Sequence, residues 1–160
     1  MSNLPCRLGA LGYIPQRLGL VGNLTVRNNV EMGVRVGLPK WHLPFFPVPS
    51  KQRGYAESAM NDLGILHLAD QPVRILSGGQ QRRVATAKTV AQRPKLVLAD
   101  EFLGELDDDN VEIVMKTVRT AIEAQNSAMI MVEHHEELAT LVANRVWRIV
   151  DGRIVEEVAE

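Results

Sequence analysis

The chain has 160 residues, 46% of them apolar, and its 18 basic side chains nearly balance 19 acidic ones. This length and apolar content predict one globular domain with a sizeable core and exclude a disordered chain. The balanced charge gives no electrostatic reason for a nucleic-acid partner, and none is expected.

The N-terminal half predicts a strand followed by two helices. Residues 11–15 have the pattern of a short strand that runs into a loop at Gln16, and residues 26–36 and 55–66 have helical patterns. Between the helices, residues 37–50 contain four prolines, a density that forbids a regular helix or a central strand. One face of the second helix carries Ala56, Ala59, Met60 and Leu63.

Three aromatic residues lie within the proline-rich stretch, namely Trp41, Phe45 and Phe46. Two interpretations stay open for them. They pack inside the domain, or they form a surface patch for a partner, since aromatic side chains are enriched at protein interfaces.

The C-terminal half alternates helices and strands. A helix is predicted at 77–92, and Pro94 ends it because the residue before a proline avoids helical angles. The apolar runs 96–99 and 128–132 predict strands buried on both faces of a parallel sheet.

Three further elements complete the pattern. A helix is predicted to begin among Asp107, Asp108 and Asp109, where carboxylates suit the positive end of the helix dipole, and another at 136–142. Asp151-Gly152 between two apolar runs indicates a two-residue hairpin turn. The order of elements predicts an α/β fold that binds ligands at the carboxyl ends of its strands.

The run Ser77-Gly78-Gly79-Gln80 opens one of the predicted helices. Glycines let a backbone approach a phosphate closely, a serine hydroxyl can donate to it, and the helix start directs free N–H groups at it. The same residues also suit a plain loop with a helix cap, so the run alone does not decide between the two.

Polar residues follow both apolar strands. Asp100 and Glu101 could divide two tasks, one holding Mg²⁺ and the other orienting or deprotonating a water, or they could form a solvated acidic turn. After the second strand, His134 could contact a γ-phosphate, serve a structural role, or bind a metal together with His135. No other His or Cys lies at ligand spacing nearby, which disfavours the metal.

Residues 76–84 read Leu-Ser-Gly-Gly-Gln-Gln-Arg-Arg-Val, and residues 93–101 read Arg-Pro-Lys-Leu-Val-Leu-Ala-Asp-Glu. Gly-Tyr-Ile-Pro-Gln at 12–16 precedes them, and Gly-Glu-Leu-Asp at 104–107 and Glu-His at 133–134 follow. In order and spacing these segments resemble the nucleotide-binding domain of ATP-binding cassette (ABC) transporters, nearest the lipoprotein-release, macrolide-export and cell-division group. The resemblance covers nearly the whole chain from about residue 11.

This resemblance implies roles at a dimer interface. Ser77, Gly78, Gly79 and Gln80 would form the signature loop, which in the family covers the γ-phosphate of ATP bound to the opposite subunit of a head-to-tail dimer. Asp107 would belong to the D-loop at the same interface.

The resemblance also implies roles around the nucleotide bound by the chain itself. Gln16 would sense the γ-phosphate and Mg²⁺ and couple to the membrane subunit. Asp100 would be the Walker B carboxylate that holds the metal, Glu101 the general base, and His134 the switch histidine.

The implied fold is a P-loop NTPase-like ABC ATPase core, a mostly parallel sheet with flanking helices, plus a helical subdomain. Within one partial domain of residues 1–160, we expect a Q-loop region at 1–23, the helical subdomain at 24–76, and the signature helix and α/β core at 77–160. The family's phosphate loop, Gly-x-x-x-x-Gly-Lys-Ser/Thr, occurs nowhere in the sequence. We therefore expect an N-terminally truncated domain that binds ATP poorly alone.

Four residues depart from the family's pattern near the catalytic carboxylate. Phe102 and Leu103 stand where relatives have a proline and a small hydroxyl residue. Glu133 replaces threonine or serine, and His135 replaces aspartate. These changes suggest altered catalysis, although the bulky apolar pair could instead only repack.

The leading hypothesis is an ATP-binding subunit of an ABC transporter that couples ATP binding and hydrolysis to transport, with ATP and Mg²⁺ as cofactors. Whether this chain is itself an active ATPase stays open. The expected partners are a transmembrane permease subunit and another ABC ATPase domain, in a homo- or heterodimer. Two alternatives are a catalytically impaired partner that lends its signature loop to another cassette, and a soluble ABC ATPase outside transport.

The expected location is cytoplasmic and peripheral to the membrane through a partner. Cys6 is the only cysteine, which suits a reducing compartment. No apolar run approaches the roughly 20 residues of a membrane-spanning helix, and the N-terminus lacks the pattern of a secretory signal.

Overall fold

The computed structural model describes residues 9–39, 46–103, 108–134, 137, 139–140 and 143–157. Some predictions fall outside these residues, namely those on Cys6, Trp41, Phe45, the 104–107 loop with Asp107, His135, and most of the helix at 136–142.

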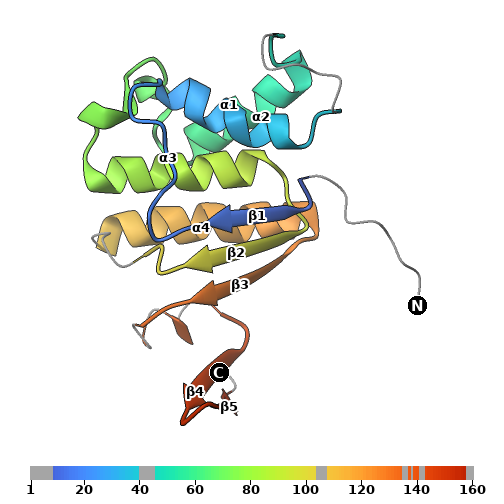
Figure 1. The fold of residues 1–160 in the computed structure, drawn as a ribbon, viewed down its shortest axis with the longest axis vertical. Helices are drawn as coiled ribbons and strands as arrows, with labels where there is room; N and C mark the ends of the chain where they lie inside the picture. The colour runs from blue at the N-terminus through green and yellow to red at the C-terminus, as the bar shows by residue number, and fades with distance from the viewer. Residues whose placement is uncertain are drawn as a thin grey trace.

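Three parallel strands form the central sheet (Figure 1). In spatial order they are β1 (Leu11–Ile14), β2 (Leu96–Asp100) and β3 (Ala128–Val132). All three run in the same direction in register, with β2 paired to both neighbours. The residues that follow the three strands therefore meet at one edge of the sheet, as the sequence predicts.

One face of this sheet carries the core. Ile14 and Val97 are buried in one cluster with Val114 and Val118 of α4 (Asp108–Gln125). The helix α3 (Gly78–Ala91) packs beside α4 and along β1. In Figure 1, α4 runs behind the strands and α3 lies between the sheet and the remaining helices.

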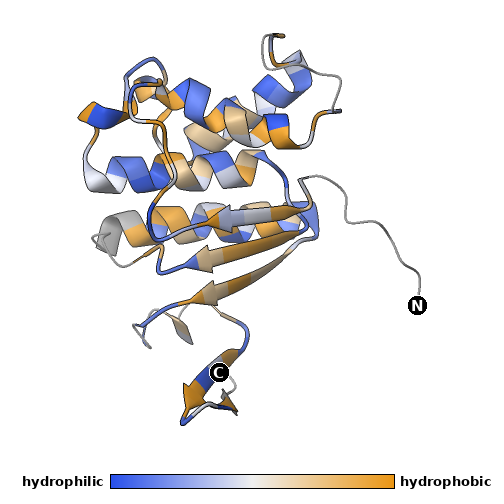
Figure 2. Ribbon diagram, in the orientation of Figure 1, coloured by the Kyte–Doolittle hydropathy of each residue, from blue (hydrophilic) through white to orange (hydrophobic). Residues whose placement is uncertain are grey.

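The opposite face has no covering layer among the residues described. Leu11 and Tyr13 of β1 and Val132 of β3 are exposed, and Ile130 is 51% exposed. Figure 2 shows the apolar colour over much of β2 and β3. The expectation of burial on both faces is therefore wrong for β3, whereas Leu96 and Leu98 of β2 are half-buried. An apolar sequence does not reveal which face a neighbour covers.

The other helices that the structure bounds among the described residues are α1 (Val26–Val36), α2 (Ser50–Asp62) and two short 3₁₀ helices, η1 (Leu66–Leu68) and η2 (Val73–Ile75). The prediction for α1 is confirmed. The prediction of a helix at 55–66 is displaced by about one turn. The helix starts directly after Pro49, and Gly64, with φ of +65°, lies beyond its end. The expected apolar face is buried and consists of Ala56, Ala59, Met60 and Leu63.

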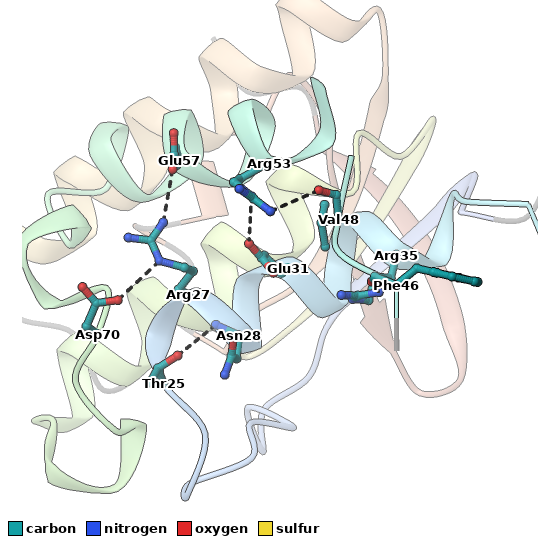
Figure 3. Close-up of polar contacts among 10 residues, drawn as sticks. All are labelled: Thr25, Arg27, Asn28, Glu31, Arg35, Phe46, Val48, Arg53, Glu57 and Asp70. Atoms are coloured by element: carbon teal, nitrogen blue, oxygen red, sulfur yellow. Dashed lines mark hydrogen bonds and ion pairs between the residues drawn. The ribbon is translucent and has the colours of Figure 1, made fainter. Parts of the chain in front are cut away.

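Charged side chains join α1 to its neighbours (Figure 3). Arg27 lies 3.2 Å from Glu57 of α2 and 3.4 Å from Asp70, and Arg53 of α2 lies 3.8 Å from Glu31. These pairs are solvent-accessible, so each contributes about 0.2–1 kcal/mol. Apolar packing therefore supplies most of the stability of this part.

The C-terminal hairpin consists of β4 (Val146–Val150) and β5 (Arg153–Glu157), paired antiparallel. Asp151 and Gly152 have φ of 49° and 73°, the left-handed angles that a two-residue hairpin turn requires. This turn was predicted and is confirmed. Among the described helices, none has the length and apolar character needed to cross a membrane.

Candidate functional site

Three polar side chains meet where the parallel strands end. Gln16 follows β1, Glu101 follows β2 directly, and His134 follows β3. Gln16 Nε2 donates to Glu101 Oε2 at 2.5 Å, and His134 Nε2 lies 2.5 Å from the other oxygen of the same carboxylate. The structure thus brings together three of the predicted site residues, with Glu101 at the centre.

The backbone turn after Glu101 is held at several points. Glu101 has a left-handed φ of 44°, and its N–H donates to Val132 O at 2.9 Å. Its carbonyl accepts from Arg82 Nη1 at 3.3 Å. Leu103 N–H donates to Glu133 Oε1 at 3.2 Å. The direction of the Glu101 side chain therefore depends on contacts from both α3 and β3.

Three of the four residues that depart from the family's pattern lie in the described part of the chain, namely Phe102, Leu103 and Glu133. Phe102 and Leu103 are fully buried in the core, which supports the interpretation that the bulky pair repacks. Glu133, which sequence reasoning treats only as added charge near a phosphate, accepts the Leu103 N–H instead. Nothing in the sequence pattern indicated this contact.

Asp100 has a partner that sequence reasoning missed. Tyr13 Oη donates to Asp100 Oδ2 at 3.3 Å. Partial desolvation and then the neighbouring Asp100 carboxylate raise the pKa of Tyr13. Tyr13 pairs with Leu98, which shares a strand face with Asp100, so the two-residue period could have revealed the contact.

The signature run forms the exposed start of α3. Ser77 Oγ accepts from Gln80 N at 3.3 Å, and the Gln80 side chain accepts from Ser77 N at 3.0 Å, which makes a capping box. A Cβ added at Gly78 would meet nothing within 4 Å. Packing among the described residues therefore does not require glycine at 78. The cap leaves the Ser77 hydroxyl proton available to a ligand.

The same helix holds the segment that carries Gln16. Thr89 Oγ1 donates to Tyr13 O at 3.2 Å, and Lys88 Nζ donates to Gly19 O at 3.1 Å. Burial lowers the pKa of Lys88. Through these contacts α3 joins the signature run to the loop that follows β1.

Metal binding was predicted at Asp100 and Gln16. Within the described part of the chain, no group of three or more His, Cys, Asp or Glu residues could hold a metal ion alone. A magnesium ion that binds with a nucleotide requires only one or two protein carboxylates. Metal binding at these two residues therefore stays a prediction.

The sequence model of the family described as ABC transporter matches residues 3–104. The chain belongs to this family. The domain that defines this family is an ATP-binding cassette, so membership implies nucleotide binding by that domain. Two curated relatives are the phosphonates import ATP-binding proteins PhnC of Nocardia farcinica, 38% identical over 148 residues, and of Escherichia coli strain K12, 34% identical over 143 residues.

These alignments cover 91% and 89% of this chain but 54% and 55% of the two relatives. The chain thus spans about half the length of the curated relatives that it matches. Their names do not confirm the expected placement in the lipoprotein-release, macrolide-export and cell-division group.

Solved structures of ABC proteins have the same fold. One is a metal-chelate type ABC transporter in an inward-facing conformation, with a TM-score of 0.79 at 25% identity over 94% of this chain and 59% of that one. Another is the dimeric, ADP- and Pi-bound ATP-binding cassette MJ0796, with a TM-score of 0.78 at 25% identity over 94% and 63% of the two chains. The predicted α/β ABC fold is thereby confirmed.

Proposed function

We propose that this chain acts in the ATP-binding subunit of an ABC transporter, where ATP binding and hydrolysis drive transport. The observation that carries the proposal is the meeting of Gln16 and His134 on the Glu101 carboxylate. It lies at the strand edge where α/β folds bind their ligands. The names of the curated relatives, ATP-binding proteins of phosphonate import, support it.

In this proposal Glu101 is the general base. Its carboxylate already accepts two short hydrogen bonds, so an arriving γ-phosphate and water would compete for Gln16 and His134 and free Glu101 to accept a proton. Asp100 and the Gln16 amide oxygen are the hard oxygen donors that Mg²⁺ prefers. When bound with the nucleotide, the ion would neutralise phosphate charge, and Tyr13 would orient Asp100.

The remaining parts of the proposal concern assembly. Residues 77–80 act as the signature loop toward ATP on another ABC ATPase domain, and Asp107 lies at the same interface. The partners are that second domain and a transmembrane permease, which keeps the protein on the cytoplasmic face of the membrane. Within this assembly the chain contributes a Q-loop region at 1–23, a helical subdomain at 24–76, and the signature helix with the α/β core at 77–160.

A second candidate is a partner that lends only its signature loop. It is favoured by the start of α3, where the capping box of the signature run is complete and exposed. The phosphate-loop pattern does not occur within these 160 residues. The chain alone should then bind MgATP weakly, because the phosphate loop supplies most contacts to the triphosphate. Isothermal titration calorimetry checks this expectation. A micromolar Kd, about −8 kcal/mol, would contradict it.

A mixing experiment tests the role of the signature loop. We expect this chain to raise the ATP turnover of a related cassette that has an intact phosphate loop. Gly78→Asp should abolish the increase, because a carboxylate there would meet the γ-phosphate with like charge. Glu101→Gln should change little in the mixture, because the 160 residues used there contain no phosphate-loop pattern that would hold ATP beside Glu101.

The matched control is Gly54→Asp. It adds the same charge on the exposed side of α2, where a Cβ would meet nothing within 4 Å. This variant should stimulate like the unmodified chain. Equal stimulation by the Gly78 and Gly54 variants would show that the signature run does not act on the partner's ATP.

A further inference from the structure

Arg82 is a charged side chain in the core of the protein, only 2% exposed. A buried guanidinium is costly unless protein groups accept its hydrogen bonds. Its Nη1 donates to the carbonyl of Glu101 at 3.3 Å. A residue of α3 thus reaches across to the backbone of the candidate general base.

Arg82 lies near the start of α3, so its contact with Glu101 connects the start of this helix to the turn after β2. Arg82 lies at the start of the second turn of α3, just after Gln80 of the capping box. Its own backbone is fixed, because its carbonyl accepts from Thr86 Oγ1 at 3.0 Å within the same helix. A shift at the start of α3 therefore moves the base of the Arg82 side chain.

The Glu101 backbone responds to such a shift because its conformation depends on its neighbours. A φ of 44° is uncommon for a residue other than glycine and persists only where surrounding contacts impose it. The contacts on this turn come from Arg82 on one side and from Val132 and Glu133 of the β3 end on the other.

We propose that Arg82 is a positioning residue, which carries the position of the signature run to Glu101 and so sets where that carboxylate points. Its catalytic meaning rests on the proposed function. In a head-to-tail dimer the signature run and Glu101 face different nucleotides, so Arg82 links the two sites within one chain.

Hydrogen exchange of backbone amides in the whole chain tests this role without nucleotide. The amides of Glu101 and Leu103 are both hydrogen-bonded in the turn. Arg82→Met keeps the length and apolar stem and removes the donor. We expect these two amides to exchange about tenfold faster, while amides elsewhere in α3 and in the sheet change much less, because the lost donor acts on this turn.

The matched control is the neighbouring arginine. Arg83 Nη1 donates to Leu63 O at 3.3 Å, toward α2 rather than toward the turn. Arg83→Met should leave exchange at Glu101 and Leu103 unchanged. Unchanged exchange in the Arg82 variant would overturn the proposal. So would a lower midpoint with even acceleration throughout α3 and the sheet, because that pattern indicates a merely structural role.

If Arg82→Met does not fold, Arg82→Leu, which also lacks a donor, is judged by the same two criteria. The link from the signature run through Arg82 to Glu101 is tested with Ser77→Ala, which removes the side-chain cap of α3. It should accelerate exchange at Glu101 and Leu103 in the unmodified chain but add nothing in the Arg82 variant. Equal acceleration in both backgrounds would overturn the link. A failure of the ATP turnover experiment alone would leave these exchange results intact and would count against the proposed function instead.

Discussion

Gly33→Ala should lower the free energy of unfolding by about 3 kcal/mol. A Cβ at position 33 would lie 2.0 Å from the carbonyl oxygen of Lys88. The obstacle is helix backbone, so α1 and α3 would have to separate. Val30 and Val34, which flank Gly33 on the buried face of α1, would lose contacts in that separation.

Gly54→Ala is the control, because Gly54 is also a helical glycine but a Cβ there would meet nothing within 4 Å. Alanine restricts the unfolded chain more than glycine does, so this variant should gain about 0.5–1 kcal/mol. Urea unfolding of both variants, with similar m-values, measures the contrast. A loss below about 1 kcal/mol for Gly33→Ala would show that α1 does not lie this close to α3.

The convergence of Gln16, Glu101 and His134 was predictable from the sequence. Each residue follows an apolar run of strand length, and the ends of parallel strands meet at one edge of the sheet. Helix α1 was equally predictable, because Thr25 supplies the cap and apolar residues recur at helical spacing through Val36.

The missed features depend on contacts between segments far apart in the sequence. Arg82 and Glu133 both have polar side chains of a kind usually assigned to the surface, yet they hold the turn after Glu101. The exposure of Ile130 was missed for the opposite reason, because its apolar sequence predicts burial regardless of whether a neighbour covers it. Local pattern therefore placed the strand ends but not the contacts that orient them.

Asn29→Asp should cost on the order of 3 kcal/mol of stability. Asn29 is fully buried, its amide oxygen faces a backbone N–H, and its amide nitrogen faces backbone carbonyls. The Asn29 oxygen accepts from Val21 N at 2.8 Å. Its Nδ2 lies 3.1 Å from Val21 O, 3.4 Å from Leu24 O and 3.0 Å from Thr25 O. A carboxylate can accept the one donor but places negative charge against these three carbonyls.

The adjacent residue provides the control for this substitution. Asn28 is exposed in the first turn of α1, and its backbone N–H donates to Thr25 Oγ1 at 3.2 Å. A carboxylate at that position suits the helix dipole, so Asn28→Asp should change stability by less than about 1 kcal/mol, in the favourable direction. Urea unfolding at neutral pH measures both variants, and equal stabilities would show that the Asn29 amide does not hold the 21–25 loop.

The pH dependence separates charge repulsion from a loss of shape in the Asn29 variant. Burial against carbonyl oxygens raises the pKa of the introduced carboxyl above its value in the unfolded chain, so folding takes up a proton and acid favours the folded state. Once protonated, the carboxyl regains one O–H donor for the carbonyls of Val21 or Thr25. The deficit relative to the unmodified protein should therefore be largest at neutral pH and narrow as the pH falls toward about 4. A deficit that stays constant with pH would assign the loss to geometry, and the carbonyl cluster would then not be what selects asparagine at position 29 of α1.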